Sequence, residues 1–428
     1  MAADSPEKGA VIVVVDAHPS HDRRSAVALF SRLRTAKGQA DPFPLYAQLR
    51  SMGPVTPAPW GGLLVTGFDM CDQVLRDREW LEPDKRWRES QGPRTRWNAP
   101  SSREMSNTMP ALNPPEHTRI RRAAGTFGRT AMQRIGRMVT QATDQLLTSL
   151  TEQLHYGEAD FAALVSEELP VAAIGDWLEV PTADRPRLRE LTHDQVFTQE
   201  LLPTASQLAL SDAATAELRA YFTDLVRQRR ARPGEDPVSM WIQTWDTLEP
   251  DRDKADEAVY FIALFVLLAA LETTSTLLST TVLRLVEHPE RWDQLAADPS
   301  LVPAFVEETL RHDPPTHVIS RIAGADSVLG GFPVRKDDMI HLMVGAAHRD
   351  PTRHPDPDRF DLRRERPDHL AFSGGIHYCL GAPLARLEAQ TLLHHLLRRL
   401  PRLTLVRRPS WAPRVAFRRL LNLDVTCA

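Results

Sequence analysis

Apolar residues recur at helical spacing over most of the middle of the chain, and this pattern predicts a mainly helical protein. Pro and Gly residues mark the joints between successive stretches, as at Pro181, Pro203 and Gly234. The predicted helices cover residues 41–50, 116–127, 131–154, 160–178, 183–197, 211–230, 255–287, 289–297, 301–312 and 380–399.

Three other stretches have the pattern of short strands. The segment G-G-L-L-V-T-G at residues 61–67 is a brief apolar run bounded by glycines. Residues 319–345 are strand-like, with a tight turn predicted at Gly330 and Gly331, and residues 403–425 alternate enough to form a hairpin. Together, the helices and strands predict a mainly α fold with small β-sheets.

Two segments show no sustained period. Residues 1–40 have the composition of a poorly ordered N-terminal arm, and residues 82–115, rich in Pro, Arg, Trp, Ser and Asn, that of a long irregular loop. Long loops inside a compact protein usually carry function or are disordered. Because no internal repeat and no clear linker divides the remainder, residues 41–428 are predicted to form a single large domain.

Charge and cysteine usage narrow the classes of function. Lys plus Arg number 52 and Asp plus Glu 56, a net charge of −4, whereas a nucleic-acid binder is normally strongly basic. Cys71, Cys379 and Cys427 lie far apart, which argues against a disulfide framework, a zinc ribbon or a haem c motif. The longest apolar run, residues 258–271, is shorter than the roughly 20 residues of a membrane span, and no signal-peptide pattern precedes it. These features predict a soluble, cytoplasmic protein that binds neither membrane nor nucleic acid.

Residues 372–381 read F-S-G-G-I-H-Y-C-L-G and place a cysteine at the start of a predicted helix. Gly374, Gly375 and Gly381 give the backbone around Cys379 conformational freedom. Helix N-termini favour negative charge, and their free amides can hydrogen-bond a thiolate sulfur. The segment therefore suits an ionised sulfur bound to a metal, although an arbitrary cysteine is more often a buried structural thiol.

Here the metal ligand is the better interpretation, because the segment closely resembles the cysteine-loop signature of the cytochrome P450 family, F-x-x-G-x-H-x-C-x-G. Every fixed position is present: Phe372, Gly375, His377, Cys379 and Gly381. The resemblance implies the cytochrome P450 fold around one haem b, with Cys379 as the iron ligand, Phe372 beside the sulfur and His377 at a haem propionate. A thiolate ligand favours O–O cleavage at haem iron.

Two further segments resemble haem-binding parts of the family. N-P-P-E-H-T-R-I-R-R, at residues 113–122, resembles its propionate-binding helix, in which His117 and Arg121 share one face. Arg321, in I-S-R-I-A, stands where the family places another propionate-binding arginine. Haem carboxylates buried in protein need cationic partners, so these three residues and His377 form a chemically sensible set.

Glu308 and Arg311 form an E-x-x-R motif on a predicted helix, where residues three apart share a face. H-P-D-P-D-R-F-D, at residues 354–361, resembles the family's meander, in which Arg359 would join Glu308 and Arg311. The resemblance implies a structural role for these residues, since a buried acid needs well-matched cationic partners to offset its desolvation.

The longest predicted helix contains A-A-L-E-T-T at residues 269–274, which resembles the family's A-G-x-[DE]-T-T. The resemblance places Ala269 and Ala270 against the haem and makes Glu272 and Thr273 an acid–alcohol pair that delivers protons during oxygen activation. A threonine in a helix more often hydrogen-bonds its own preceding carbonyl, and this alternative stays open for Thr273. Ala270 replaces the family's usual Gly, so we expect less space near the oxygen-binding groove and an effect on coupling, not a change of reaction class.

The resemblance implies a monooxygenase that inserts one atom of O2 into a lipophilic small molecule, by hydroxylation or epoxidation, as a tailoring step in bacterial natural-product biosynthesis. Because no flavin or nicotinamide motif is present, a ferredoxin and a ferredoxin reductase would supply the electrons from NAD(P)H. The enzyme is expected to be a monomer. The expected substrate pocket is largely apolar. Its predicted lining residues are Leu264, Leu268, Ala269, Thr316, Val318, Ile319 and Phe417.

Three alternatives remain open at this level. A haem-binding sensor or carrier without turnover is one, and the Glu272–Thr273 pair argues against it because ligation alone needs no proton relay. A cysteine hydrolase using Cys379 and His377 is another, but residues two apart at a loop end are poorly placed to act as a pair. The Arg and Trp side chains of the 82–109 loop could contact an anionic or carrier-bound substrate, or could simply be solvated.

Overall fold

The computed structural model describes residues 21–125, 129–365 and 367–428. Helices dominate it, as the sequence predicts, and the predicted helix 289–297 coincides with α14. The helices are α1 (His21–Leu33), α2 (Ala36–Ala40), α3 (Phe43–Ser51), α4 (Phe68–Arg76), α5 (Lys85–Ser90), α6 (Pro100–Met105), α7 (Glu116–Ala124), α8 (Arg129–Leu154), α9 (Glu168–Trp177), α10 (Arg185–Gln195), α11 (Ala205–Ala231), α12 (Pro237–Leu248), α13 (Arg252–Val286), α14 (Pro289–Ala297), α15 (Val302–His312), α16 (Val344–Ala347) and α17 (Ala382–Arg399).

Three small sheets accompany the helices and confirm the predicted strands. The largest has the order β1-β2-β8-β5-β3, with β2 and β8 parallel and the other pairs antiparallel. The second has the order β4-β10-β9, and the third is the β6–β7 hairpin, which turns at Gly330 and Gly331 with positive φ. The strands are β1 (Val55–Pro57), β2 (Leu63–Val65), β3 (Trp80–Leu81), β4 (Ala159–Asp160), β5 (Ile319–Ala323), β6 (Ser327–Leu329), β7 (Phe332–Val334), β8 (Met339–Leu342), β9 (Leu403–Leu405) and β10 (Asp424–Cys427).

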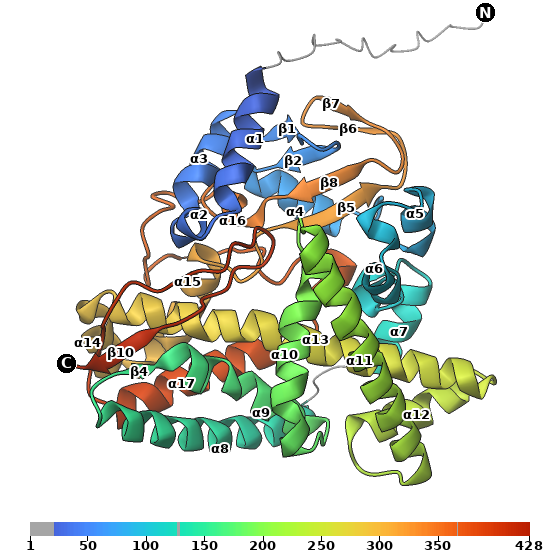
Figure 1. Cartoon of the computed structure of the whole chain (residues 1–428). Coiled ribbons are helices and arrows are strands. Elements are labelled where there is room, and N and C mark those ends of the chain that lie inside the picture. The colour runs from blue at the N-terminus through green and yellow to red at the C-terminus, as the bar shows by residue number, and fades with distance from the viewer. Residues whose placement is uncertain (1–20, 126–128, 366) are drawn as a thin grey trace, which may run out of the picture.

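The long helix α13 runs through the middle of the molecule and connects its two main apolar cores (Figure 1). Its C-terminal half packs with α8, α15 and α17, and its N-terminal half packs with α9, α10, α11 and α12. The five-stranded sheet lies with α1 to α3 at the opposite end from α8 and α17 (Figure 1). Asp251 caps the start of the helix, and its side chain accepts hydrogen bonds from the amides of Asp253 and Lys254.

Helix α13 is also long and apolar enough, by length and composition, to cross a membrane. However, 72% of its most apolar 18-residue window is buried inside the protein. A helix that is apolar all round and buried is the expected core element of a large soluble protein.

The N-terminal arm prediction is wrong for residues 21–40, which form α1 and α2. Ala26, Leu29, Phe30 and Leu33 recur at helical spacing and are all buried, so α1 packs its apolar face into a core shared with α3. The stripe spans only about two turns and follows the charged stretch of residues 21–24, so its period was not recognised in the sequence. Residues 1–20 lie outside the described part of the chain.

The 82–115 segment is less irregular than predicted, because it contains α5 and α6. Both helices have six residues, too few for a helical period to be recognised. Local chemistry defines them instead: the Asp84 side chain caps α5, and Pro100 begins α6. Helix α12 was also missed, although Asp236 caps it and Pro237 occupies its first turn.

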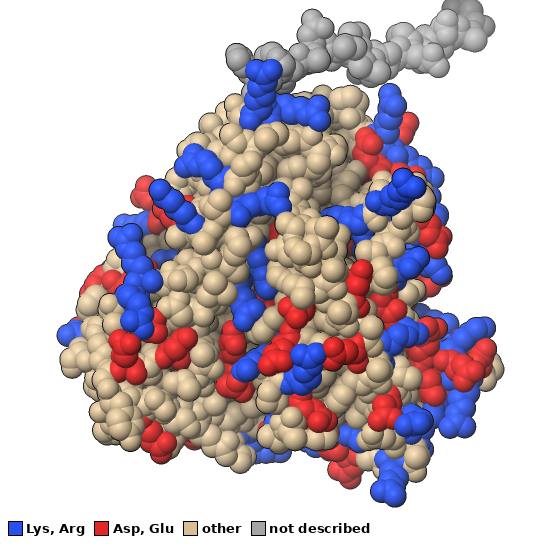
Figure 2. Space-filling view, viewed as in Figure 1, with Lys and Arg blue, Asp and Glu red and all other residues tan. Residues whose placement is uncertain are grey.

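Surface charges agree with the near-balance of the composition. Basic and acidic side chains are interspersed over the lower, helical half of the face shown in Figure 2. Many of them pair across elements, such as Arg230 of α11 with Asp246 of α12 at 2.7 Å and Arg187 of α10 with Glu217 of α11 at 2.8 Å. Exposed pairs of this kind contribute little stability individually, about 0–1 kcal/mol each.

Candidate active site

Cys379 lies just before α17, at the end of a tight loop. Its amide donates a hydrogen bond to the Phe372 carbonyl oxygen over 2.9 Å, which closes the loop. Gly375 has a φ of +61°, and a Cβ at this position would lie 2.6 Å from the Leu75 carbonyl oxygen. Only glycine fits there, so the sequence signature has a steric cause.

The backbone amides of Gly381 and Ala382, at the beginning of α17, act to lower the pKa of the Cys379 thiol. Burial raises the pKa of the Cys379 thiol, and these amides, with Arg121 and Arg386, offset only part of that effect. A nucleophilic cysteine needs a lowered pKa, whereas a metal-bound thiol loses its proton to the metal. The environment therefore suits a metal ligand and disfavours the cysteine-hydrolase alternative.

Four basic side chains predicted to hold haem carboxylates are brought together from three parts of the chain. The His117 and His377 rings lie 4.2 Å apart between centroids, and Nη2 of Arg121 donates to the Tyr378 carbonyl oxygen over 2.7 Å. Burial, Arg321, His117 and Arg121 lower the pKa of His377 to about 3. Nε2 of His117 is buried and has no hydrogen-bond partner. These basic groups repel one another, and one buried nitrogen has no partner. An anionic group bound among them would relieve both costs.

Glu82 is a carboxylate in this cluster that sequence reasoning missed. Its Oε1 lies 2.6 Å from Nη1 of Arg321 and 4.0 Å from Nδ1 of His377. Burial raises the pKa of Glu82 to about 7, against the opposing charges of Arg321 and Arg88. No local signal could have revealed it, because Glu82 simply follows β3 and is far from its partners in sequence.

One face of α13 is open although the helix runs through the core. Ala269 is exposed, and Ala270 and Thr273 are half-buried, whereas their neighbours Leu268 and Leu271 are buried. Residues four apart share a helix face, so Ala269 and Thr273 border the same internal space. The Thr273 hydroxyl donates a hydrogen bond to the Ala269 carbonyl oxygen over 3.0 Å, which is the alternative left open by the sequence.

Glu272 points away from that face into a buried charged network. Its Oε2 lies 2.7 Å from Nδ1 of His193, and its Oε1 accepts a hydrogen bond from Arg414. Burial alone would raise the pKa of Glu272, but His193 and Arg414 outweigh it and hold the pKa below its usual value. Neither partner was predicted, since one lies on α10 and the other near the C-terminus.

Comparison with known proteins identifies the family. The model of the cytochrome P450 family matches residues 212–405. The cytochrome P450 monooxygenase PikC of Streptomyces venezuelae is 34% identical over 397 residues, which cover 90% of this chain and 91% of that protein. The chain belongs to the cytochrome P450 family.

Other relatives of this P450 agree in sequence and in structure. The mycinamicin IV hydroxylase/epoxidase of Micromonospora griseorubida is 32% identical over 363 residues, 83% of this chain and 87% of that protein. A crystal structure of P450BioI, in complex with an acyl carrier protein bearing hexadec-9Z-enoic acid, superimposes with a TM-score of 0.83. That match has 28% identity and covers 92% of this chain and all of the other. The protein is a monooxygenase with a mainly α P450 fold, as predicted.

This P450 uses haem b, and the described residues fit that cofactor. The Cys379 sulfur would take the iron, with Phe372 packed in the same apolar cluster. The basic groups contributed by α7, β5 and the cysteine loop would take the two propionates. The open face of α13 at Ala269 and Ala270 provides surface for the flat porphyrin. Among the described residues there is no cluster of three His, Cys, Asp or Glu side chains suited to a metal.

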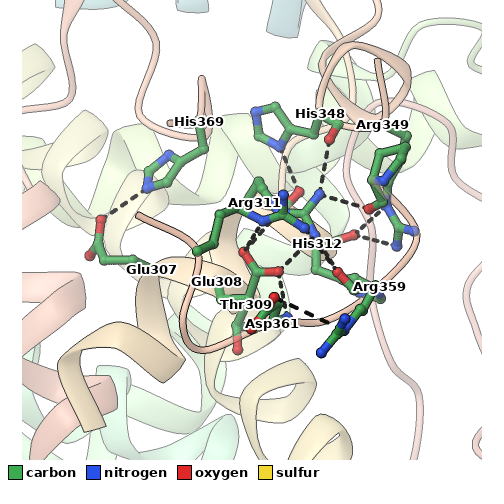
Figure 3. Close-up of polar contacts among 12 residues, drawn as sticks. Glu307, Glu308, Thr309, Arg311, His312, His348, Arg349, Arg359, Asp361 and His369 are labelled. Atoms are coloured by element: carbon green, nitrogen blue, oxygen red, sulfur yellow. Dashed lines mark hydrogen bonds and ion pairs between the residues drawn. The ribbon is translucent and has the colours of Figure 1, made fainter. Parts of the chain in front are cut away.

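The predicted E-x-x-R network forms, with one correction (Figure 3). Arg311 pairs with Glu308 through two bonds of 2.8 Å and also donates to the carbonyl oxygens of His348, Pro357 and Arg359. The Arg359 side chain does not join them: it is 70% exposed and faces Asp361 at 4.0 Å. The second cation on Glu308 is Arg364, at 3.5 Å. The chain turns between Asp361 and Arg364, so the side chain of Arg364, five residues after Arg359, reaches the acid.

The predicted substrate residues fall into two groups. Thr316 and Phe417 pair through a β-bridge, and Val318 packs in the same core as Phe417. Leu264 and Leu268 belong instead to the core that α13 forms with α9 to α12. Ile319 is half-buried at the start of β5. Two of these positions thus lie on α13 and the others near the start of β5 and the C-terminal segment, and their role as a substrate pocket stays a prediction.

Most of the Arg and Trp side chains of the 82–109 loop have internal partners. The Trp97 ring lies between two guanidinium groups, those of Arg96 at 4.1 Å and Arg88 at 5.2 Å. Arg88 is buried and bonds to the Pro83 carbonyl and to Ser102, and the Trp87 indole donates to the Asp337 carbonyl. These residues therefore hold the loop together, which leaves few of them to contact an anionic substrate.

Proposed function

We propose that this P450 hydroxylates or epoxidises a free, lipophilic small molecule as a tailoring step in bacterial natural-product biosynthesis. The observation that carries the proposal is the open, apolar face of α13 at Ala269, directly beside an acid–alcohol pair. Relatives named for such chemistry support it, among them the mycinamicin IV hydroxylase/epoxidase and the 6-deoxyerythronolide B hydroxylase of Saccharopolyspora erythraea, which is 32% identical over 375 residues.

Each site residue has a distinct role in this proposal. Cys379 holds the iron, and His117, Arg121, Arg321 and His377 neutralise the carboxylates of the cofactor. Bound haem supplies the redox chemistry that splits dioxygen and transfers one oxygen atom. Aliphatic side chains around α13 would contact the apolar part of the substrate and exclude water from it, which would orient the substrate.

Thr273 and Glu272 would handle the protons. The Thr273 hydroxyl donates its hydrogen bond to the Ala269 carbonyl oxygen. Its lone pairs can therefore accept a hydrogen bond from a group at the open face of α13. Glu272 neighbours Thr273, and its carboxylate pairs with His193 and Arg414. In this arrangement Thr273 would position a water at the open face, and Glu272 would pass protons to that water by turning its carboxylate from His193 and Arg414 toward Thr273.

Electrons would arrive from NAD(P)H through a ferredoxin reductase and a ferredoxin, in the cytoplasm, and the enzyme would work as a monomer. Arg122 and Arg386 are two candidate docking residues for the ferredoxin. Arg386 binds Glu307 through bonds of 2.6 and 2.9 Å and lies over the Phe372 ring, so its first role is to support the cysteine loop. Arg122, near the end of α7, stays a candidate for docking.

The test is a spectral titration of the purified haem protein with lipophilic candidate compounds, followed by turnover with a surrogate ferredoxin system. We expect compounds that displace the distal water to be converted to products heavier by one oxygen atom. Cys379→Ala should lose both the thiolate-type spectrum of the carbon monoxide complex and the activity. Retention of both by that variant would refute the ligand assignment, and oxidation only of carrier-bound substrates would refute the free substrate.

A further inference from the structure

His193 of α10 stands between two carboxylates from other parts of the chain. Its Nδ1 lies 2.7 Å from Oε2 of Glu272, and its Nε2 faces Oε2 of Glu167 at 3.8 Å. This Nε2 is buried and makes no hydrogen bond, although a small movement of either side chain would close the gap to Glu167. Both ring nitrogens are therefore directed at groups that can give or take a proton.

These three side chains lead outward from α13. The exposed fraction of the side chain rises along the row, from 4% for Glu272 to 15% for His193 and 19% for Glu167, so the Glu167 end is the more accessible to solvent. Glu167 directly follows a π-helical turn, η3 (Ala162–Ser166), and its amide bonds to the Ala162 carbonyl five residues earlier. Such turns are rare and often occur at functional sites.

Two arginines, Arg414 and Arg419, pair with Glu272, His193 and Glu167. Arg414 binds Glu272 and also donates to the His193 carbonyl over 3.1 Å, and Arg419 binds Glu167 at 2.7 Å. Burial lowers the pKa of His193, but its pairing with Glu167 and Glu272 outweighs burial and raises the pKa above its usual value, with Arg419 opposing. The two carboxylates have lowered pKa values, to about 2 for Glu167, because their basic partners outweigh burial.

We propose that His193 is a proton-relay residue that carries protons from solvent at Glu167 to Glu272, and thereby to the oxygen-activation site. This inference rests on the proposed function, which gives Glu272 its part in proton delivery. In each cycle the imidazolium gives its Nδ1 proton to Oε2 of Glu272, and the electron pair of the N–H bond stays on the ring. Rotation of the ring then presents the bare nitrogen to Glu167, which passes on a proton taken from water and restores the imidazolium.

An imidazole is needed because the carboxylates alone are poor carriers. Both are held ionised by their basic partners, so neither keeps a proton near neutral pH. Histidine is the side chain whose charge changes in this range, and a flanking carboxylate on each side keeps it loaded. A purely structural ion network would fix the same residues in place but would not require His193 to change its charge.

The first experiment measures the titration of His193 directly. In the ferrous carbon monoxide complex of the holoenzyme, ¹⁵N NMR of labelled histidines should show a ring with a pKa above about 6.5, assigned by its loss in His193→Asn. Glu167→Gln should lower that pKa. A wild-type His193 that stays neutral down to pH 6 would overturn the proposal.

The second experiment measures oxygen uptake and product formed per electron against pH. It uses the holoenzyme, a surrogate ferredoxin system and the compound with the largest spectral shift. The Asn side chain can still donate to Glu272 but cannot carry a proton. We therefore expect His193→Asn to lower the rate about tenfold or more and to remove the fall of the wild-type rate above the pKa of His193.

A matched control is available on α17. His395 of α17 has its Nδ1 2.7 Å from Oδ1 of Asp144, the same distance as in the His193–Glu272 pair. His395→Asn should leave the rate and the pH profile unchanged.

Glu272→Gln separates the two proposals. If it slows turnover while His193→Asn retains the wild-type rate and pH profile, the relay is refuted and the proposed function stands. If Glu272→Gln has no effect on coupling, the role given to Glu272 fails and the relay fails with it.

Discussion

Oε1 of Glu82 lies 2.6 Å from Nη1 of Arg321, within the group of basic side chains that would hold the haem propionates. Arg321 is almost completely buried, so it needs an anionic partner whether or not the cofactor is bound. Glu82 supplies that partner inside the protein. A haem propionate approaching the same guanidinium would then meet a like charge, unless Glu82 takes up a proton.

Glu82→Gln is expected to strengthen haem retention, because the amide removes the negative charge that competes for Arg321. Transfer of haem to apomyoglobin should be several-fold slower from the variant than from the wild type. Glu89→Gln, an exposed position in the same segment, serves as the control. Faster haem loss from Glu82→Gln would instead show that the carboxylate helps to hold the cofactor.

Glu82 also predicts a pH dependence of the apoprotein. Its pKa is raised from 4.5 to about 7 in the folded state, mainly by burial. A raised pKa means that the folded state binds the proton more tightly, so this contribution is complete below the unfolded pKa and is lost as pH rises through 7. Between about pH 5 and pH 8 the wild type should lose on the order of 1–3 kcal/mol more stability than Glu82→Gln, measured by urea unfolding.

Arg364 and Arg359 provide a direct test of the meander. Arg364→Gln removes a mostly buried cation from Glu308 and should destabilise the protein by about 1–3 kcal/mol. Arg359→Gln changes an exposed side chain and should stay within about 0.5 kcal/mol of the wild type. Thermal unfolding of both variants tests this assignment. A larger loss of stability in Arg359→Gln than in Arg364→Gln would show that Arg359 is the partner of Glu308, as the sequence predicted.

Thr273→Ala is expected to uncouple electron use from product formation, because it removes a hydroxyl from the open face that contains Ala269. Product per electron should fall several-fold, with oxygen consumed to form peroxide or water. Thr148→Ala removes a hydroxyl with the same kind of back-bond, 2.8 Å to the Asp144 carbonyl on α8, and should have no effect. Unchanged coupling in Thr273→Ala would exclude this residue from proton handling.

Gly375→Ala should disturb the cysteine loop, since its new methyl group would collide with the Leu75 carbonyl oxygen in addition to straining a positive φ. We expect a loss of at least about 1 kcal/mol and weaker haem binding. Gly92→Ala also has a positive φ, but nothing lies within 4 Å of its added methyl, so it isolates the cost of backbone strain. If both variants lost the same amount of stability, the predicted collision with the Leu75 carbonyl oxygen would be refuted.

The sequence by itself determined the parts of the site whose residues lie close together in the chain. Three parts of the site consist of residues that are close in sequence: the cysteine loop, the His117–Arg121 pair and the Glu308–Arg311 pair. On a helix, spacing alone sets which side chains share a face. The long apolar run of α13 likewise identified the core helix. In each case local geometry follows from local sequence.

Only the tertiary structure decided the contacts that join distant segments. Glu82 meets Arg321, Glu272 meets His193 and Arg414, and Arg364 takes the place expected for Arg359. Residues 21–40 became ordered for the same reason, since their short apolar stripe gains its stability from packing against α3. Spacing beyond a few turns does not fix a distance, because the path of the intervening chain is set by how the whole core packs.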